Sequence, residues 1–291
     1  MSVSVTHFTD PGCPWAYSAR PAHAALRWRY GDQLDWRLVL IGLAERAEVY
    51  EERGYTPERQ VEGYRMFSTR FGMPFGYEPK PRVSGTSRGC RAIVVARDQD
   101  PALGDAALRA LQLLQFTTPG RLDDDADLRA ALAGIDGLDA DALVASLDDA
   151  DVWARYDVDR ALTRSAEGTP THAQGKTASH GGPERYTAPS LIFRTEDGRS
   201  LEAGGFQSLE AYDVILANLA PGLERRPVTE DPVELLAAFP EGLTTAEVAE
   251  AMRRDLAPDD RAGALAALTR AAQAGDVRRA DVGDDALWYA A

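Results

Sequence analysis

The sequence has 291 residues and a formal net charge of −14 at pH 7, which allows one large domain plus a small one and argues against general binding to nucleic acid or anionic membranes. No stretch approaches the ~20 apolar residues of a membrane span, and residues 1–16 lack the basic start and apolar run of a secretory signal. We therefore expect a soluble, cytoplasmic protein, in which two distant cysteines do not form a structural disulfide framework.

The chain is predicted to open with a strand and a helix. Residues 3–8 form a β-rich run that ends in turn residues, which indicates a buried strand. A helix is predicted from Pro14 to about Tyr30, with a kink near Pro21, because proline is tolerated at the first helical position. Cys13 would then lie at a helix N-terminus, where free N–H groups and the helix dipole favour a thiolate. We expect its pKa to lie below that of a free cysteine.

The middle of the chain is predicted to be largely helical. Residues 35–43 form an apolar run of strand type, so the opening is strand, helix, strand, with a right-handed crossover between parallel strands. Residues 85–166 carry apolar side chains at helical spacing, interrupted by Pro and Gly. The later predicted elements are a strand at 190–194, a turn at 197–198, a strand at 200–203 and an amphipathic helix at 208–219.

The last part of the chain, residues 225–291, reads as a small separate unit. After a linker, three short helices (232–239, 245–254 and 259–274) and a closing hairpin (277–289) look like a winged-helix module. From Arg226 onward there are thirteen acidic and seven basic side chains, a net charge of −6. Duplex binding depends mainly on neutralising phosphates. We therefore favour a protein-contact role, such as homodimer formation, over DNA binding.

The turn around the first cysteine reads Asp10-Pro11-Gly12-Cys13-Pro14-Trp15-Ala16-Tyr17. It resembles the active-site turn of the DsbA-like branch of the thioredoxin superfamily, most closely the FrnE-like group, with 2-hydroxychromene-2-carboxylate isomerases and kappa-class glutathione transferases as relatives. The resemblance implies an α/β thioredoxin fold over residues 1–224, with a large all-helical insertion at about 45–185. Ala16 stands where that pattern has a second cysteine, so Cys13 cannot close a local disulfide.

A second match lies at Ala188-Pro189, just before a predicted strand, where a proline must occupy the first position or an edge. The resemblance implies that this proline is cis and faces Cys13, leaving the main chain of Ala188 open to an extended substrate or a small thiol. Pro14, Trp15 and Tyr17 are expected to contribute to the same substrate site. The alternative for the two aromatic residues is packing against the insertion.

A third, weaker match is Ser84 to Ala92, which resembles a family segment N-T-x-x-A-H-R that begins a helix over the active site. Gly85 replaces the asparagine and Cys90 replaces the histidine. Cys90 is a candidate resolving cysteine, with plain packing inside a helix as the alternative. His180, in the polar loop before the second match, is a candidate proton handler. No Cys/His set has zinc spacing and no phosphate-binding loop is present, so no metal or nucleotide is expected.

The resemblance implies a thiol–disulfide oxidoreductase with one nucleophilic cysteine. Cys13 would form a mixed disulfide with a small thiol or protein disulfide substrate, and a thiol of glutathione or mycothiol type would release it, without a tightly bound cofactor. Two alternatives stay open. In an isomerase or transferase that depends on a thiol cofactor, Cys13 would take the place of a supporting serine; a non-catalytic regulatory protein would have kept only the fold.

Overall fold

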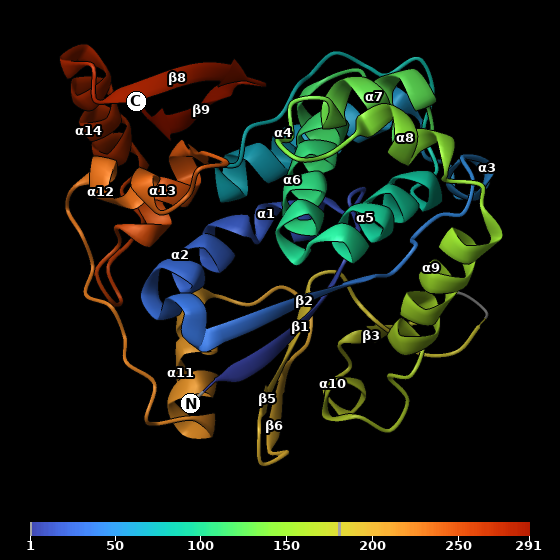
Figure 1. The fold of residues 1–291 in the computed structure, drawn as a ribbon, viewed down its shortest axis with the longest axis horizontal. Coiled ribbons are helices and arrows are strands. Elements are labelled where there is room, and N and C mark those ends of the chain that lie inside the picture. Colours follow the sequence, from blue (N-terminus) through green and yellow to red (C-terminus); the bar gives the residue numbers. More distant parts are fainter. Residues whose placement is uncertain (1, 180–181) are drawn as a thin grey trace.

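A computed structural model describes residues 2–179 and 182–291 of the chain. Its centre is a four-stranded sheet in the order β2-β1-β5-β6 (Figure 1). The strands are β1 (Val3–Thr9), β2 (Leu34–Leu40), β5 (Ser190–Thr195) and β6 (Ser200–Ala203). β1 pairs in parallel with β2 and antiparallel with β5, which pairs antiparallel with β6. The parallel pair confirms the crossover that the sequence predicts.

The helix that follows β1 is broken close to the predicted kink. α1 (Pro14–Ser18) and α2 (Arg20–Tyr30) meet at Ala19. Pro21 has no N–H to donate to the carbonyl four residues earlier, so the helical hydrogen-bond ladder is interrupted at this point. A short turn, η1 (Gly31–Gln33), then leads into β2. Strand, helix and strand therefore follow one another as expected.

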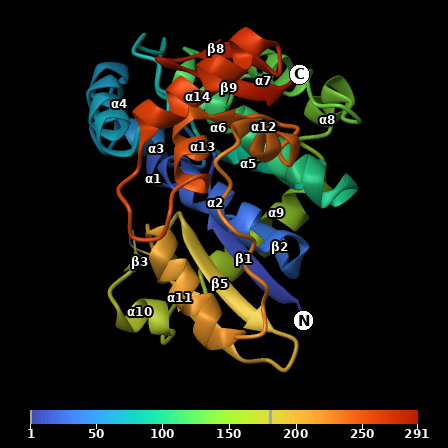
Figure 2. The same cartoon turned by 90° about the vertical axis from the view of Figure 1, so that its left-hand side faces the viewer.

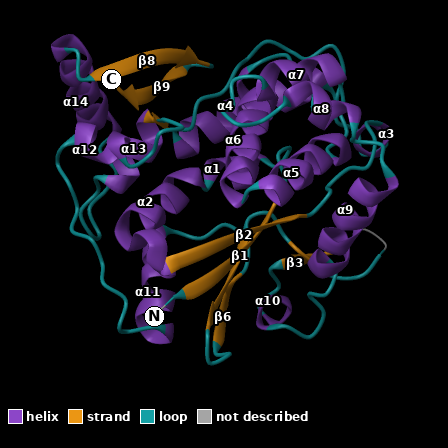
Figure 3. Cartoon of the chain, in the orientation of Figure 1, coloured by secondary structure: helices purple, strands orange, loops and turns teal. Residues whose placement is uncertain are grey.

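Helices fill most of the region between β2 and β5, as Figure 3 shows. They are α3 (Glu48–Glu51), α4 (Pro57–Phe71), α5 (Ser87–Gln99), α6 (Pro101–Thr117), α7 (Asp125–Leu132), α8 (Ala140–Ala145), α9 (Ala150–Thr163) and α10 (Pro170–Ala173). The expectation of an all-helical insertion needs one correction, because β3 (Thr177–Ala178) pairs with β4 (Arg185–Tyr186) near its end. Two-residue strands are too short to leave an alternating pattern in the sequence.

One face of the sheet packs against α2 and the closing helix α11 (Leu209–Leu219). The buried side chains in this layer include Val3, Val5, Leu26, Phe193 and Leu216. Within residues 2–179 and 182–291, no helix combines the length and apolar character needed to cross a membrane. The sheet and its two flanking helices form the scaffold from which the Cys13 turn projects.

The predicted helices and hairpin of the last segment are all present, and one short strand is added. The elements are α12 (Pro232–Ala237), β7 (Leu243–Thr244), α13 (Thr245–Ala251), α14 (Arg261–Ala274), β8 (Val277–Val282) and β9 (Asp285–Ala290). The three strands lie in the order β7-β9-β8. The winged-helix assignment, and the preference for protein contact over DNA binding, stay predictions.

This C-terminal segment packs directly onto the first part of the chain (Figure 2). Its apolar side chains, among them Leu235, Val248 and Trp288, belong to the same buried cluster as those of α2 and β1. In addition, Asp284 in the β8–β9 turn accepts hydrogen bonds from the backbone N–H of Phe75 (2.8 Å) and from neighbouring hydroxyls. The core is therefore continuous across the linker, in contrast to the separate unit suggested by the sequence.

Candidate active site

Cys13 occupies the N-cap position of α1, at the end of the turn that follows β1. Its backbone N–H donates to Asp10 O (3.1 Å), and its own carbonyl accepts the first helical hydrogen bond, from Tyr17 N (3.0 Å). Gly12 allows the N-terminus of α5 to approach, because a Cβ at that position would lie 2.5 Å from Thr86 Cγ2. The turn is thus held between the sheet and the insertion.

Asp10 is a fully buried carboxylate that fixes this turn. Oδ1 accepts from Gly12 N (2.8 Å), and Oδ2 accepts from Leu43 N (2.8 Å), Thr86 Oγ1 (3.0 Å) and Cys90 Sγ (3.5 Å). Burial raises the pKa of Asp10, and these hydrogen bonds act in the opposite direction. With four donors bound, the carboxylate holds the turn, the β2–α3 loop and the N-terminus of α5 together.

Cys13 lies directly against the second motif. Its Sγ donates to the carbonyl oxygen of Ala188 at 3.3 Å. The peptide bond between Ala188 and Pro189 is cis, as the resemblance implied. The two segments, 175 residues apart in sequence, are therefore brought together at the sulfur, which is the central juxtaposition that the sequence analysis predicts.

The expected acidity of Cys13 is wrong. Only 6% of the residue is exposed, and burial raises its pKa to about 12. The backbone N–H groups of Ala16 and Trp15 lower that pKa, while the charge of Asp10 raises it. Desolvation disfavours the thiolate more than the helix N-terminus stabilises it. The resting group at neutral pH is a protonated thiol that donates a hydrogen bond.

The two aromatic residues of the motif have different surroundings. Trp15 is 39% exposed and makes edge contacts with three phenylalanines; these are Phe67, Phe71 and Phe206. Tyr17 is fully buried, and its hydroxyl donates to Pro74 O at 2.9 Å. The expectation that Tyr17 forms part of the substrate site is corrected, because packing against the insertion leaves it no free surface. Trp15 stays a candidate, beside Pro14.

Three further residues that the sequence analysis singles out are Cys90, His180 and Gly85. Cys90 is completely buried within α5, and its role as a resolving cysteine stays a prediction. His180 lies outside the described residues. Gly85, which replaces the family asparagine, is packed so closely that a Cβ would lie 2.9 Å from Arg46 Cα. The backbone of the loop between β2 and α3 therefore fills the space that an asparagine side chain would need.

Two residues near Cys13 were not predicted. The charge of Arg185, on β4, lowers the pKa of Cys13, and Tyr50, on α3, has its own pKa raised by burial and then by Asp10 and Cys13. Within the described part of the chain, Arg185 forms no ion pair with a carboxylate. Neither residue belongs to a motif, so only the folded arrangement places them here. Among the same residues, no group of three or more His, Cys, Asp or Glu side chains could hold a metal ion.

Comparison with solved structures identifies the fold. The chain is similar to a candidate protein disulfide isomerase from Nitrosomonas europaea, with a TM-score of 0.55 and 14% identity, over 75% of this chain and 97% of that one. It is also similar to a probable DsbA oxidoreductase from Streptomyces coelicolor, with a TM-score of 0.52 and 21% identity, over 78% and 93% of the two chains. No family model and no curated protein matches the sequence. The chain has a DsbA-like thioredoxin fold with a helical insertion.

Proposed function

We propose that the protein catalyses thiol–disulfide exchange with Cys13 as its single nucleophile. The second substrate would be a low-molecular-weight thiol of glutathione or mycothiol type. The observation that carries this proposal is the 3.3 Å contact between Cys13 Sγ and the carbonyl of Ala188. It sets one sulfur beside a stretch of main chain to which the backbone of a small thiol or an extended peptide could bind.

The proposed reaction consists of two successive thiol–disulfide exchanges. The Cys13 thiolate attacks a disulfide R–S–S–R′, forming Cys13–S–S–R and releasing R′–S⁻. A small thiol R″–SH, as its thiolate, then attacks the R sulfur, which forms R–S–S–R″ and returns Cys13. Because Ala16 supplies no second sulfur, no intramolecular resolution within the turn occurs. The small thiol is the reductant, and the protein undergoes no net redox change.

The first step requires the Cys13 proton to leave. Asp10 already accepts four hydrogen bonds, and within the described residues the Cys13 thiol donates to Ala188 O, so no direct hydrogen bond carries the proton to Asp10. The proton would instead pass to a base in solvent or to a bound substrate. Binding of that substrate would also change the surroundings of the sulfur. Exchange should therefore accelerate with pH throughout the neutral range, in step with the thiolate fraction.

Two groups near Cys13 could bind a small thiol: Trp15 through its aromatic surface and Arg185 through a carboxylate of the thiol. Trp15 offers a partly exposed aromatic surface beside the Cys13 turn. Arg185 supplies a positive charge near the sulfur and, in the described chain, has no acidic partner of its own. A carboxylate of the incoming thiol could pair with Arg185. The positive charge of Arg185 would also stabilise the negative charge that develops on the Cys13 sulfur.

The test is turnover of the mixed disulfide between glutathione and 2-mercaptoethanol, with excess glutathione. We expect Cys13→Ser to abolish catalysed exchange and Cys90→Ala to retain it. Arg185→Gln should raise KM for glutathione more than it lowers kcat, because the proposed contact is with a part of the thiol that does not react. Full turnover by Cys13→Ser would refute the proposal.

A second candidate is an isomerase or transferase that binds a thiol cofactor without reacting with it. The protonated state of Cys13 favours this reading, because a neutral thiol can donate its one hydrogen bond to a bound cofactor in place of Ala188 O. Incubation with oxidised glutathione separates the candidates. A covalent adduct on Cys13 supports exchange, whereas reversible binding of reduced glutathione with no adduct supports the cofactor role.

A further inference from the structure

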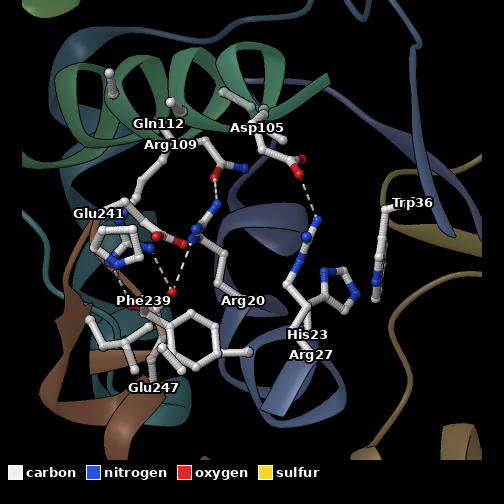
Figure 4. Close-up of a pocket in the computed structure, with 18 of the residues that line it drawn as sticks. Arg20, His23, Arg27, Trp36, Asp105, Arg109, Gln112, Phe239, Glu241 and Glu247 are labelled. Carbon is white, nitrogen blue, oxygen red and sulfur yellow. Dashed lines mark hydrogen bonds and ion pairs between the residues drawn. The ribbon is translucent and has the colours of Figure 1, made fainter. Parts of the chain in front are cut away.

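A cavity lies apart from Cys13, between α2, α6 and the C-terminal segment. Its volume is about 870 Å³, and Cys13 is not among its lining residues. Small-molecule sites usually occupy roughly 300–1,000 Å³. Figure 4 shows Arg20 and Arg27 reaching from α2 toward α6, with residues of the C-terminal segment closing the other side. Residues of that segment, among them Phe239 and Leu243, form part of the cavity wall.

The wall of this cavity contains two arginines that share one carboxylate. Glu247 Oε1 accepts from Arg20 Nε (3.0 Å) and from Arg109 Nη1 (2.8 Å), and Oε2 accepts from Arg109 Nη2 (2.9 Å). The Glu247 and Arg109 side chains are almost fully buried, and that of Arg20 is 19% exposed. The three groups carry a net charge of +1 in a poorly solvated place, which an anion in the cavity would offset.

Arg20 retains donor capacity toward the cavity. Its Nη1 donates to Gln112 Oε1 (3.1 Å), and its Nε is bound to Glu247. No hydrogen bond from Nη2 of Arg20, or from Nε2 of Gln112, is present within residues 2–179 and 182–291. These two unpartnered donors come from different helices and belong to side chains that line the same cavity. Two N–H donors beside a net positive charge match a carboxylate.

The cavity also offers apolar surface on either side of Arg20 (Figure 4). Arg27 pairs with Asp105 (2.9 Å), and its guanidinium lies over the ring of Trp36, 4.5 Å from the ring centroid. Phe239 and Leu243 of the C-terminal segment line the same space. An occupant with an aromatic or aliphatic body could bury that body here while an acidic group binds at Arg20.

Three acidic side chains of the lining, Asp32, Asp136 and Glu241, form no ion pair among the described residues and oppose an anion, while Arg226 adds one further positive charge. Glu241 lines the cavity and is exposed, and it forms no ion pair with either arginine among the described residues. Its charge therefore reduces the positive potential without occupying the donors of Arg20. Removing the charge of Glu241 should strengthen the binding of an anion, whereas removing the charge of Arg20 should weaken it.

We propose that this cavity binds a small organic anion: a carboxylate attached to an apolar or aromatic body. The carboxylate would accept hydrogen bonds from Arg20 and Gln112, and the body would lie against Phe239. The occupant would bridge the thioredoxin part and the C-terminal segment. This site does not depend on the chemistry proposed for Cys13.

The experiment compares three probes that share one body and differ in charge: indole-3-acetate, indole-3-acetamide and tryptamine. Binding to the full-length chain is measured by titration calorimetry at neutral pH. We expect indole-3-acetate to bind at least about tenfold more tightly than the other two. Arg20→Gln should weaken it by about tenfold or more, and Glu241→Gln should strengthen it severalfold. Cys13→Ala should leave its affinity unchanged.

Arg27→Gln is a second variant that leaves the buried cluster of Arg20, Arg109 and Glu247 intact. It should weaken indole-3-acetate severalfold even if Arg20→Gln unfolds the chain, a point that thermal unfolding of each variant would establish. Equal affinity for the anion and the amide, unchanged affinity in both arginine variants, or no saturable binding of indole-3-acetate would overturn the proposal. Loss of exchange activity alone would not, because that result concerns Cys13.

Discussion

The raised pKa of Cys13 has a direct kinetic consequence for its reaction with an alkylating reagent. Alkylation requires the thiolate, so its rate follows the thiolate fraction. The perturbation is pH alone, applied to the Cys90→Ala variant so that a single thiol is present. We expect the logarithm of the iodoacetamide rate to rise by about one unit per pH unit from pH 7 to about pH 10 without levelling off, because the group remains far below its pKa.

The magnitude follows from the surroundings of the sulfur. Burial brings the pKa of Cys13 to about 12 from an ordinary value of 9.0. At any pH below both values, the thiolate fraction is lower than that of an unperturbed cysteine by about a thousandfold. A thiolate of higher pKa is a stronger nucleophile, which recovers part of this difference. Limited access to a residue that is only 6% exposed reduces the rate further but does not change the shape of the pH profile.

The assay follows the intact mass of the protein after reaction for set times and acid quenching. The same variant unfolded in denaturant provides the reference thiol, and Cys13→Ser provides the blank. A rate that levels off at or below about pH 8 would refute the reasoning, because it would require a pKa near or below that of a free thiol. In that case the backbone N–H groups of α1 would lower the pKa of Cys13 more than burial raises it.

Three further predictions concern stability. Burial, followed by the charges of Arg20 and Arg27, lowers the pKa of His23 to about 3. Below about pH 6.5 the unfolded state takes up a proton on this histidine, whereas the folded state does not. The free energy of unfolding therefore falls as the pH falls, by about 2 kcal/mol at pH 5. Denaturant titrations of the wild type and His23→Phe should show this difference, and equal pH dependence would contradict it. Glu247→Gln should destabilise the chain by about 3–5 kcal/mol in the same assay, because two buried arginines lose their carboxylate, whereas an effect below 1 kcal/mol would mean that the cluster is well solvated. Gly283→Ala should cost at least ~1 kcal/mol, since its φ is +56° and a Cβ would lie 2.7 Å from Phe75 O; unchanged stability would show that the hairpin turn is not held against Phe75.

The sequence predicts the longer strands and helices well because each of them carries a local signal. The turn around Cys13 combines a strand end, a glycine and a proline at the first helical position, and all three act where the sequence places them. The contact with Ala188 was predictable only through the resemblance, since no local pattern links two segments 175 residues apart. The helical spacing of apolar side chains predicts the helices of the insertion, but it does not predict the short β3–β4 pair.

The acidity of Cys13 could not be predicted because it is the balance of two opposing terms. The helix N-terminus is visible in the sequence and lowers the pKa, whereas burial under the insertion is a tertiary property and raises it more. Tyr17 is a similar case. Its place in the motif suggests a site residue, but the aromatic side chains of the insertion enclose it.

The docking of the C-terminal segment was also beyond reach of the sequence. Its linker and its element order suggest a separate unit, yet Glu247 and Asp284 form hydrogen bonds with the first part of the chain. Such pairs involve side chains distant in sequence, and a single acidic residue on a predicted helix reads equally well as a solvated one. The cavity beside Arg20, whose wall this segment helps to form, was not predicted.

The central claim is that the sulfur of Cys13 exchanges with small disulfides beside Ala188. The most direct measurement is the intact mass of the Cys90→Ala protein after incubation with oxidised glutathione at about pH 9, where the thiolate fraction is higher than at neutral pH. The account predicts one glutathionyl group on Cys13, removed by added glutathione and absent from the protein that also carries Cys13→Ser. An unmodified Cys13 under these conditions, in folded protein, would contradict it.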